Sequence, residues 1–332
     1  MKPSCAALLT ILFASSVIFG DEKPNQISIA TWNVEWFFDS YTGDNSSDLA
    51  KEQSAPSRGE WDWKLEQVAR VVAEMKPTIL ALQEIENREV VRRLTKKLSD
   101  KYKLKYRIAF IQGWDSFTEQ DVAVIYQSGL VQYSCREQTS EMFSSREYYN
   151  LNKHLFAEFE WGDGKEKESL TLLTVHLRAT AEKHDLRQKQ CKLMKRWIEE
   201  KISNGGNVIV LGDLNTEQLA DSINRKSELA ILCGWETATK SDDLYDLHHF
   251  LPPQYRSTHL ANRQFDRILV SQSMLEDRKN VKDLKFSQIA NFRNLVIVGE
   301  TDKEHFNKYY KIPRDQRDVS DHYPVMAQFL FQ

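Results

Sequence analysis

The feature that most constrains this chain is a set of short apolar runs, each flanked by polar residues suited to binding a metal ion or a phosphate. The runs have the length and composition of buried β-strands. The polar residues are Asn33, Glu84, His176, Asp213 with Asn215, and Asp321 with His322 before the last run. In α/β proteins, sites form at strand ends and in the loops beyond them. The pattern therefore predicts a sheet-based fold with one composite site.

Helical and strand-like segments alternate early in the chain, and strands group together later. Apolar residues recur at helical spacing from Leu65 to Met75, from Val90 to Leu98 and from Glu182 to Ile202. Strands are predicted at 27–34, 78–83, 106–112, 121–126, 155–161, 169–176, 208–211, 265–270 and 325–331. A polar stretch follows the first strand, and we expect a long loop over 39–63. The pattern predicts a mixed α/β class.

The first twenty residues have the composition of a secretory signal peptide. Lys2 precedes a largely apolar stretch that ends at Gly20, and this stretch is too short for a membrane anchor. We expect residues 1–20 to be removed and the protein to be secreted or periplasmic. No linker divides the remainder, so residues 21–332 are expected to form one domain. We expect a monomer with no stable membrane association.

Charge and cysteine content exclude two simple classes of protein. The net charge of −3 provides no strongly basic surface, which argues against holding nucleic acid by charge alone. Cys135, Cys191 and Cys233 follow the signal region and are far apart in sequence. Their spacing indicates neither a zinc site nor a disulfide framework. We expect one disulfide bridge or three buried thiols.

Taken singly, each polar residue is ordinary, because an acidic residue at a strand end is usually a helix cap or a solvated loop residue. Their joint order, together with Phe265-Asp266-Arg267-Ile268 and Ser320-Asp321-His322-Tyr323-Pro324-Val325, resembles the endonuclease/exonuclease/phosphatase superfamily. Within it, the chain is most similar to secreted deoxyribonuclease I-like enzymes. The resemblance implies a four-layer α-β-β-α sandwich with two packed mixed sheets.

The resemblance also implies a division of roles in phosphodiester hydrolysis. Glu84 and Asp321 would bind a hard divalent ion, Mg²⁺ or Mn²⁺, with Ca²⁺ as a further candidate. His322 would accept a proton from the attacking water, with Asp266 orienting its ring. Asp213 would position that water or a second metal ion.

Further residues would contact the substrate phosphate. Asn33 and Asn215 would donate amide hydrogens to it, and His176 would act as a second donor or acid. In the similar enzymes this histidine pairs with a carboxylate, for which Asp121 is the nearest candidate here. Arg178 lies two residues after His176 and points to the same side of an extended chain, so it is a candidate phosphate contact or a surface ion pair.

Some features differ from the deoxyribonuclease pattern. Glu86 stands where those enzymes carry a DNA-gripping Arg, which weakens the inference of double-stranded DNA. We expect Glu35 to face solvent, although it is also placed to approach the metal. Among the remaining histidines, His248 and His249 are expected to be structural or surface residues, and the role of His259 is open.

Substrate choice is expected to depend on the loops over 39–63 and 299–318, of which the second interleaves basic and aromatic residues. The leading prediction is a nuclease with DNA or RNA as its substrate. The alternatives are a sphingomyelinase-like lipid phosphodiesterase and a small-molecule phosphodiesterase or phosphatase. The lipid alternative requires an exposed aromatic anchor. Trp36-Phe37-Phe38 is a candidate, but its place after a strand favours burial.

Overall fold

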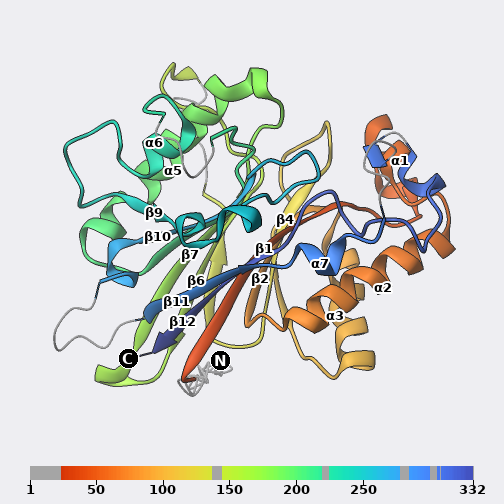
Figure 1. Cartoon of the computed structure of the whole chain (residues 1–332), viewed down its shortest axis with the longest axis horizontal. Coiled ribbons are helices and arrows are strands. Elements are labelled where there is room, and N and C mark those ends of the chain that lie inside the picture. Colours follow the sequence, from red (N-terminus) through yellow and green to blue (C-terminus); the bar gives the residue numbers. More distant parts are fainter. Residues whose placement is uncertain are drawn as a thin grey trace, which may run out of the picture.

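Two β-sheets stacked face to face, with helices on their outer faces, form the body of the computed structural model (Figure 1). The structure describes residues 24–136, 144–218, 224–276, 284–299, 305–306 and 308–331. The predicted signal peptide lies outside the described residues. The predicted four-layer sandwich with mixed sheets is confirmed.

The first sheet has the strand order β11-β12-β1-β2-β4-β3. Its strands are β1 (Gln26–Phe37), β2 (Ile79–Ile85), β3 (Arg107–Phe110), β4 (Asp121–Tyr126), β11 (Leu284–Asn291) and β12 (Val325–Phe331). β1 and β2 run parallel, and the other pairs are antiparallel. The parallel pair brings the polar residues that follow both apolar runs to the same end of the sheet.

The second sheet has the order β5-β6-β7-β8-β10-β9. Its strands are β5 (Leu130–Ser134), β6 (His154–Trp161), β7 (Glu168–His176), β8 (Val208–Asp213), β9 (Leu244–Asp246) and β10 (Asp266–Ser271). β7 and β8 are parallel, whereas β10 runs antiparallel to β8. β10 therefore begins at the edge where β7 and β8 end.

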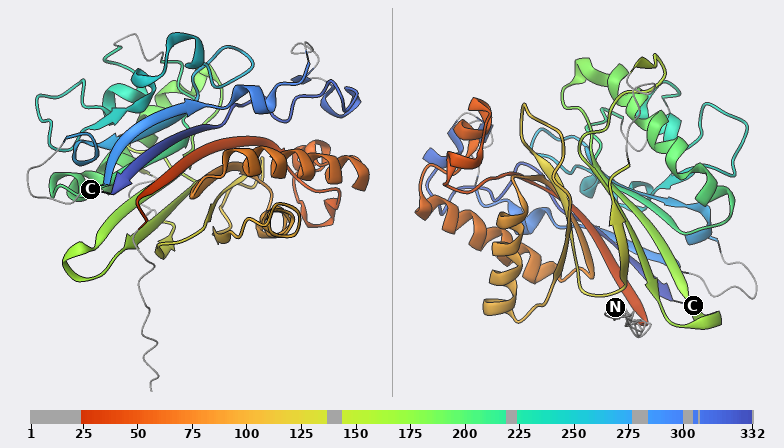
Figure 2. Two further views of the ribbon diagram at one scale, coloured as in Figure 1. Left: turned by 60° about the horizontal axis from the view of Figure 1, so that its bottom comes forward. Right: turned by 180° about the vertical axis from the view of Figure 1, so that it is seen from behind.

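The helices cover the two outer faces, as the left view of Figure 2 shows. α2 (Arg58–Met75) and α3 (Arg88–Tyr102) pack on the first sheet, and α5 (His184–Ser203) and α6 (Glu228–Leu232) pack on the second. A separate apolar cluster fills the space between the sheets. Short helices are α1 (Asp48–Gln53), α7 (Arg293–Val296) and the 3₁₀ turns at 42–44, 164–166, 181–183, 247–250, 253–255, 272–274 and 309–311.

The polar stretch after β1 is more helical than predicted. α1 forms within it, and α2 begins at Arg58, where the Ser57 side chain accepts the Glu60 backbone N–H as an N-cap. Lys76 ends α2 in the left-handed conformation, one residue before Pro77. The first turns of α2 are stabilised by the N-cap and lack the regular apolar spacing of the later turns. The apolar periodicity therefore predicted a start of this helix at Leu65, which is too late.

Three strands escaped the sequence prediction: β5, β9 and β11. β5 is mostly exposed, β9 spans only three residues, and β11 alternates irregularly because its pairing with β12 shifts between Phe286 and Gln288. These strands are fixed by their neighbours in the sheet and carry little hydrophobic pattern of their own.

Two remaining sequence expectations concern membranes and cysteines. No helix in the described part of the chain is long and apolar enough to cross a bilayer.

Cys135, Cys191 and Cys233 are free thiols in the described structure, with Cys191 and Cys233 buried and Cys135 partly so. The structure thus supports thiols rather than a bridge.

Candidate active site

The site lies at one edge of the sandwich, where strands of both sheets end. Asn33 and Glu84 come from β1 and β2 of the first sheet, and His176 and Asp213 come from the ends of β7 and β8 in the second. Sheet register pairs Asp213 with His176 on one side and with Asp266 on the other. Long-range strand pairing therefore gathers residues that are scattered through the sequence.

His322 and Asp266 form the most closely coupled pair of the site. His322 Nδ1 lies 2.7 Å from Asp266 Oδ2, and both side chains are buried. Burial disfavours the charged imidazole, but the negative charges of Asp266, Asp321 and Asp213 outweigh it and hold the pKa of His322 well above its usual value. This geometry is suited to a histidine whose Nε2 exchanges protons while a carboxylate orients its ring.

Asn33 lies at the centre of the group. Its Nδ2 donates to Glu84 Oε1 and to Asp213 Oδ2, at 3.0 Å in each case, and lies 3.4 Å from His322 Nε2. The Glu35 backbone N–H donates to Asn33 Oδ1 at 2.9 Å and so fixes which end of the amide faces the site. The amide N–H groups are therefore directed at the carboxylates of Glu84 and Asp213.

His176 and Asp213 form the wall contributed by the second sheet. His176 Nε2 lies 3.5 Å from Asp213 Oδ2 and 4.0 Å from Glu84 Oε1. Burial holds the pKa of His176 well below its usual value and raises the pKa of Asp213. A neutral histidine in this position can donate a hydrogen bond without carrying charge.

The side-chain amide of Asn215 is hydrogen bonded outside the group of site residues, although its backbone contacts Asp213. Its backbone N–H donates to Asp213 Oδ1 at 2.9 Å, and its Nδ2 donates to the Leu177 carbonyl at 3.2 Å. It adopts a left-handed conformation with φ of 48°. The structure therefore places Asn215 beside the site, with its amide hydrogen bonded to the backbone.

Glu84 and Asp321 form a donor set that fits a hard divalent cation. Burial and the nearby negative charge of Asp321 raise the pKa of Glu84 to about 7. The two carboxylates are only partly exposed and repel each other unless a proton or a cation offsets their charge, and oxygen ligands are those that Mg²⁺ and Mn²⁺ prefer. The residues present therefore fit the metal ion that the sequence predicts.

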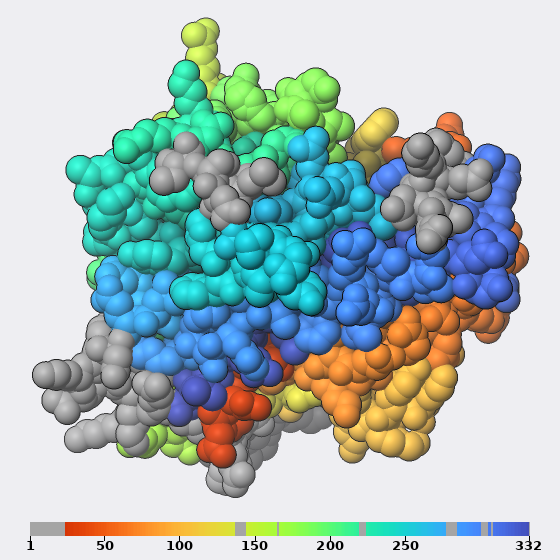
Figure 3. All heavy atoms as spheres, in the orientation of Figure 1, coloured from red at the N-terminus to blue at the C-terminus, as the bar shows by residue number. Residues whose placement is uncertain are grey.

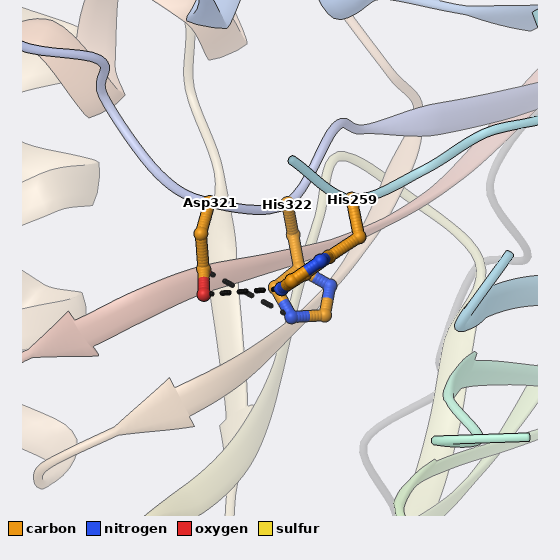
Figure 4. Close-up of side chains that lie close together, drawn as sticks. All are labelled: His259, Asp321 and His322. Atoms are coloured by element: carbon orange, nitrogen blue, oxygen red, sulfur yellow. Dashed lines mark hydrogen bonds and ion pairs between the residues drawn. The ribbon is translucent and has the colours of Figure 1, made fainter. Parts of the chain in front are cut away.

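His259 joins this group although its role was open from sequence. The ligand atoms of His259, Asp321 and His322 lie within 4.8 Å of one another, and Figure 4 shows both rings turned toward the carboxylate. His259 Nδ1 accepts the Ala261 backbone N–H at 2.9 Å, so in the neutral ring Nε2 carries the proton. A protonated Nε2 is a donor, which suits a contact to Asp321 better than direct metal binding.

Glu35 does not face solvent, contrary to expectation. Its carboxylate contacts His305 Nε2 at 2.7 Å and accepts the Asp321 backbone N–H at 3.0 Å. It has a left-handed backbone with φ of 50°, which turns the chain at the edge of the sheet. The expectation failed because His305, which is 270 residues away in sequence, supplies the partner.

Asp121 is not paired with His176 as expected. It begins β4, where its carboxylate accepts the Gly113 backbone N–H at 2.7 Å and a hydrogen bond from Gln112. Among the described residues, His176 Nδ1 has no hydrogen-bond partner. Sequence proximity to a strand favoured Asp121, but the loop before β4 occupies its carboxylate.

The neighbourhood of His176 contains Asp115 and Lys153 instead. Their side chains form a 2.9 Å ion pair, and both charges influence the pKa of His176. They line a cavity of about 290 Å³ together with Glu84, His176 and Arg178. The guanidinium of Arg178 lies 5.9 Å from the centre of the Tyr149 ring. The structure thus places Arg178 beside the site.

The basic loop predicted over 299–318 is largely occupied by internal contacts in its described part. Arg314 and Arg317 both contact Glu60, at 2.8 and 2.5 Å. The Arg317 side chain is buried and also donates to backbone carbonyls. These two cations make internal contacts, whereas Lys303 lies outside the described residues and Lys311 is exposed, so the substrate role of this loop stays a prediction.

His259, Glu35, His305, Asp115 and Lys153 are the functional candidates that sequence reasoning missed or left unassigned. Each lies outside the apolar runs that marked the other site residues, and Glu35 does so because β1 continues beyond the predicted run over 27–34. The segment His259-Leu260-Ala261 has no sequence pattern that indicates a site. It reaches the site because His259 pairs with His322 in an antiparallel bridge. His248 behaves as expected, since it is buried next to Asp246, and His249 is exposed.

Comparison with known proteins gives one family and a set of shared folds. The sequence model of the Endonuclease/Exonuclease/phosphatase family matches residues 28–330. No curated protein sequence matches the chain. TDP2 from C. elegans superposes with a TM-score of 0.55 at 18% identity, covering 95% of this chain and 78% of that one.

Two further solved structures show the same fold. D. rerio TDP2 in complex with a single-strand DNA product has a TM-score of 0.54 at 16% identity, covering 92% of this chain and 99% of that one. The human Nocturnin catalytic domain with a bound sulfate anion has a TM-score of 0.56 at 14% identity, covering 93% and 94%. At these identities the likeness shows the fold alone.

Proposed function

The chain belongs to the endonuclease/exonuclease/phosphatase family and is a metal-dependent phosphodiester hydrolase, and from that premise we propose that it is a nuclease acting on DNA or RNA. We propose Mg²⁺ or Mn²⁺ as the ion, with Glu84 and Asp321 holding it. When bound, such an ion polarises a phosphoryl oxygen and offsets the negative charge that develops during cleavage. Proton transfer and hydrogen bonding to the phosphate are assigned to side chains of the protein.

In this proposal, His322 acts in the neutral form, which it would reach when an ion held by Asp321 offsets one of the charges that raise its pKa. Its Nε2 then accepts the proton of the attacking water, and Asp266 stabilises the resulting imidazolium through Nδ1. Neutral His176 donates a hydrogen bond to a phosphate oxygen, and Asn33 would donate one with an N–H that now contacts Glu84 or Asp213. Asp213 contacts both Asn33 and His176, so it keeps these donors aligned. Asn215 supports Asp213 through its backbone N–H and would reach a phosphate oxygen only after its amide turns.

The observation that supports a nucleic acid substrate is the cavity beside Glu84 and His176. It is lined by Arg178 and by the amide side chains of Gln120, Asn150 and Asn152. The amide of Gln190, which also lines it, is hydrogen bonded to the Arg178 N–H and the Asn150 carbonyl. Amide and guanidinium groups form hydrogen bonds with sugar hydroxyls, base edges and neighbouring phosphates. Such a wall suits a polar nucleotide next to the scissile phosphate.

A substrate panel tests this proposal: plasmid, linear DNA, RNA, sphingomyelin and bis-nitrophenyl phosphate, each with Mg²⁺ or with EDTA. We expect cleavage of nucleic acid in Mg²⁺ and its loss in EDTA. The variant His322→Ala should be inactive on every substrate that the native enzyme cleaves, with His249→Ala as an exposed histidine control. Cleavage of sphingomyelin alone would reject the nuclease, and full activity in EDTA would reject the metal.

A lipid phosphodiester is the second candidate, favoured by one observation. Phe37 and Phe38 are buried, but Trp114 and Phe117 in the loop before β4 are 89% and 68% exposed. Asp115 of this loop lines the cavity beside the site. Exposed aromatic side chains insert into the interface of a membrane. The double variant Trp114→Ala/Phe117→Ala should lose activity on sphingomyelin vesicles and keep it on bis-nitrophenyl phosphate if this candidate is correct.

We also propose that the chain is exported, on the composition of residues 1–20. That it is a monomer is a separate proposal. Amino-terminal sequencing of protein recovered from the periplasm or medium tests the export. Recovery of the uncleaved chain in the cytoplasm would reject it. Light scattering of the purified protein tests the monomer.

A further inference from the structure

The turn that precedes β10 runs alongside the segment that precedes β12. His259 and His322 form an isolated antiparallel bridge, with the Leu260 N–H donating to the Asp321 carbonyl at 2.9 Å. The Tyr323 N–H donates to the Thr258 carbonyl at 2.8 Å. In the space-filling view of Figure 3, cyan residues from the part of the chain before β10 border blue residues from its C-terminal part.

This pairing sets His259 against the Asp321 carboxylate. His259 Nε2 lies 3.3 Å from Asp321 Oδ2, while the other oxygen, Oδ1, lies 3.9 Å from His322 Nε2 (Figure 4). His259 is 8% exposed, and its ring is flanked by those of Phe265 and Phe306. The ring therefore has little freedom to turn away from the carboxylate.

The tautomer of His259 is set by the turn itself. The Ala261 backbone N–H donates to Nδ1 at 2.9 Å, and Asn262 closes the turn in the left-handed conformation with φ of 58°. Because Nδ1 accepts a hydrogen bond, the single proton of the neutral ring must sit on Nε2. Nε2 is then a donor aimed at Asp321.

We propose that His259 is a positioning residue that orients Asp321 for metal binding. Its Nε2–H holds Oδ2, so that Oδ1 is left on the side of His322. The Glu35 carboxylate assists by accepting the Asp321 backbone N–H, and His305 holds Glu35 in turn. Residues that orient a metal ligand in this way contribute about 10- to 100-fold to metal affinity.

The same turn supports the other acidic partner of His322. Thr258 Oγ1 accepts the Asp266 backbone N–H at 3.0 Å, one residue before His259. Two successive residues of one turn thus fix Asp266 and Asp321, which lie on opposite sides of the His322 ring. The inference about His259 rests on the proposed metal role of Asp321 and does not depend on which phosphodiester is cleaved.

Calorimetric titration of Mn²⁺ into the full chain without substrate tests the proposal. His259→Leu should raise the Kd for Mn²⁺ about 10- to 100-fold. His259→Gln keeps an N–H near the position of Nε2 and should raise the Kd much less. His249→Leu, at an exposed histidine, should leave the Kd unchanged. A folded His259→Leu variant that binds Mn²⁺ as the native protein does would overturn the proposal.

Nitrogen NMR of the imidazoles gives a second readout that needs no variant to fold. We expect His259 to show the Nε2–H tautomer in the native, metal-free protein. Observation of the Nδ1–H tautomer would overturn the proposal. Protein that binds Mn²⁺ in a manner dependent on His259, yet cleaves no nucleic acid, would retain this inference and reject the proposed substrate.

Discussion

His322 and Asp266 are 56 residues apart in the chain, yet His322 Nδ1 contacts Asp266 Oδ2 at 2.7 Å. The contact leaves His322 Nε2 facing Asn33, Asp213 and Asp321, the side on which a phosphate would bind. Asp266 comes from β10 and His322 from the segment before β12, so the pair joins the two sheets at the site.

The first prediction concerns this pair. Asp266→Asn and His322→Ala should each lower kcat by about 100- to 10,000-fold, the usual contribution of a general base. The double variant should be little worse than either one, because the two residues act as a unit. Steady-state kinetics on the best substrate of the panel measures this, with Glu52→Gln at an exposed position as the control. Normal turnover in Asp266→Asn would contradict the pairing.

The second prediction concerns pH and metal affinity. Burial and the charge of Asp321 raise the pKa of Glu84 to about 7. A protonated Glu84 cannot hold a cation, so Mn²⁺ should bind about tenfold more weakly at about pH 6 than at about pH 8. Titration calorimetry over this range measures the slope. Glu84→Gln should bind weakly at both values, and a native affinity independent of pH would exclude Glu84 as a ligand.

The third prediction concerns acid stability and His154, which is buried away from the site. Its Nε2 accepts the Arg136 N–H at 2.9 Å, its Nδ1 lies 2.6 Å from the Leu151 carbonyl, and burial lowers its pKa to about 4. Because the pKa of His154 is lower in the folded than in the unfolded protein, the neutral ring stabilises the fold at pH values above the unfolded pKa of about 6.5. This stabilisation is lost as the pH falls toward about 4.

Urea unfolding at about pH 7 and about pH 4.5 measures this contribution. As the pH falls from about 7 to about 4.5, the free energy of unfolding should decrease by about 2 kcal/mol more in the native protein than in His154→Gln. Only the native protein has a buried ring that must be protonated. The exposed His184→Gln should behave as the native protein does. An equal loss in His154→Gln would show that His154 is not responsible.

The fourth prediction concerns a buried ion pair behind Arg178. Arg187 Nε contacts Glu228 Oε1 at 2.7 Å, and Arg187 Nη1 donates to the Arg178 and Thr180 carbonyls. Arg187→Met should lower the free energy of unfolding by about 3–5 kcal/mol, because it leaves Glu228 buried without its charge partner. Arg187→Met/Glu228→Met should recover part of that loss in urea unfolding. Equal stability of the two variants would argue against the pair.

The elements that could be predicted from sequence are those with a strong pattern of their own. The predicted strands at 121–126 and 325–331 match β4 and β12, because each is a run of mostly buried residues. The stretch over 39–63 could not be predicted in this way. Its helices depend on caps such as Ser57 and on contacts such as the Arg314 contact to Glu60, between residues 254 apart.

The residues of the site also separate into those that could be predicted from sequence and those that could not. Asn33, Glu84, His176, Asp213, Asp321 and His322 were found because each flanks an apolar run, and the structure brings them together at one edge. Their partners were not found reliably: Glu35 was expected in solvent and Asp121 beside His176. A partner across the fold leaves no mark in the local pattern of either segment.

The sequence by itself therefore determined a mixed α/β class and the main polar residues, and the resemblance of its ordered motifs to a known family implied the sandwich, since strand patterns and motifs are local properties of the chain. The tertiary structure alone decided which carboxylate meets which histidine. Asp266 meets His322, His305 meets Glu35, and His259 meets Asp321. These contacts depend on sheet register and loop pairing, which place side chains within 3.3 Å across separations of 56, 270 and 62 residues.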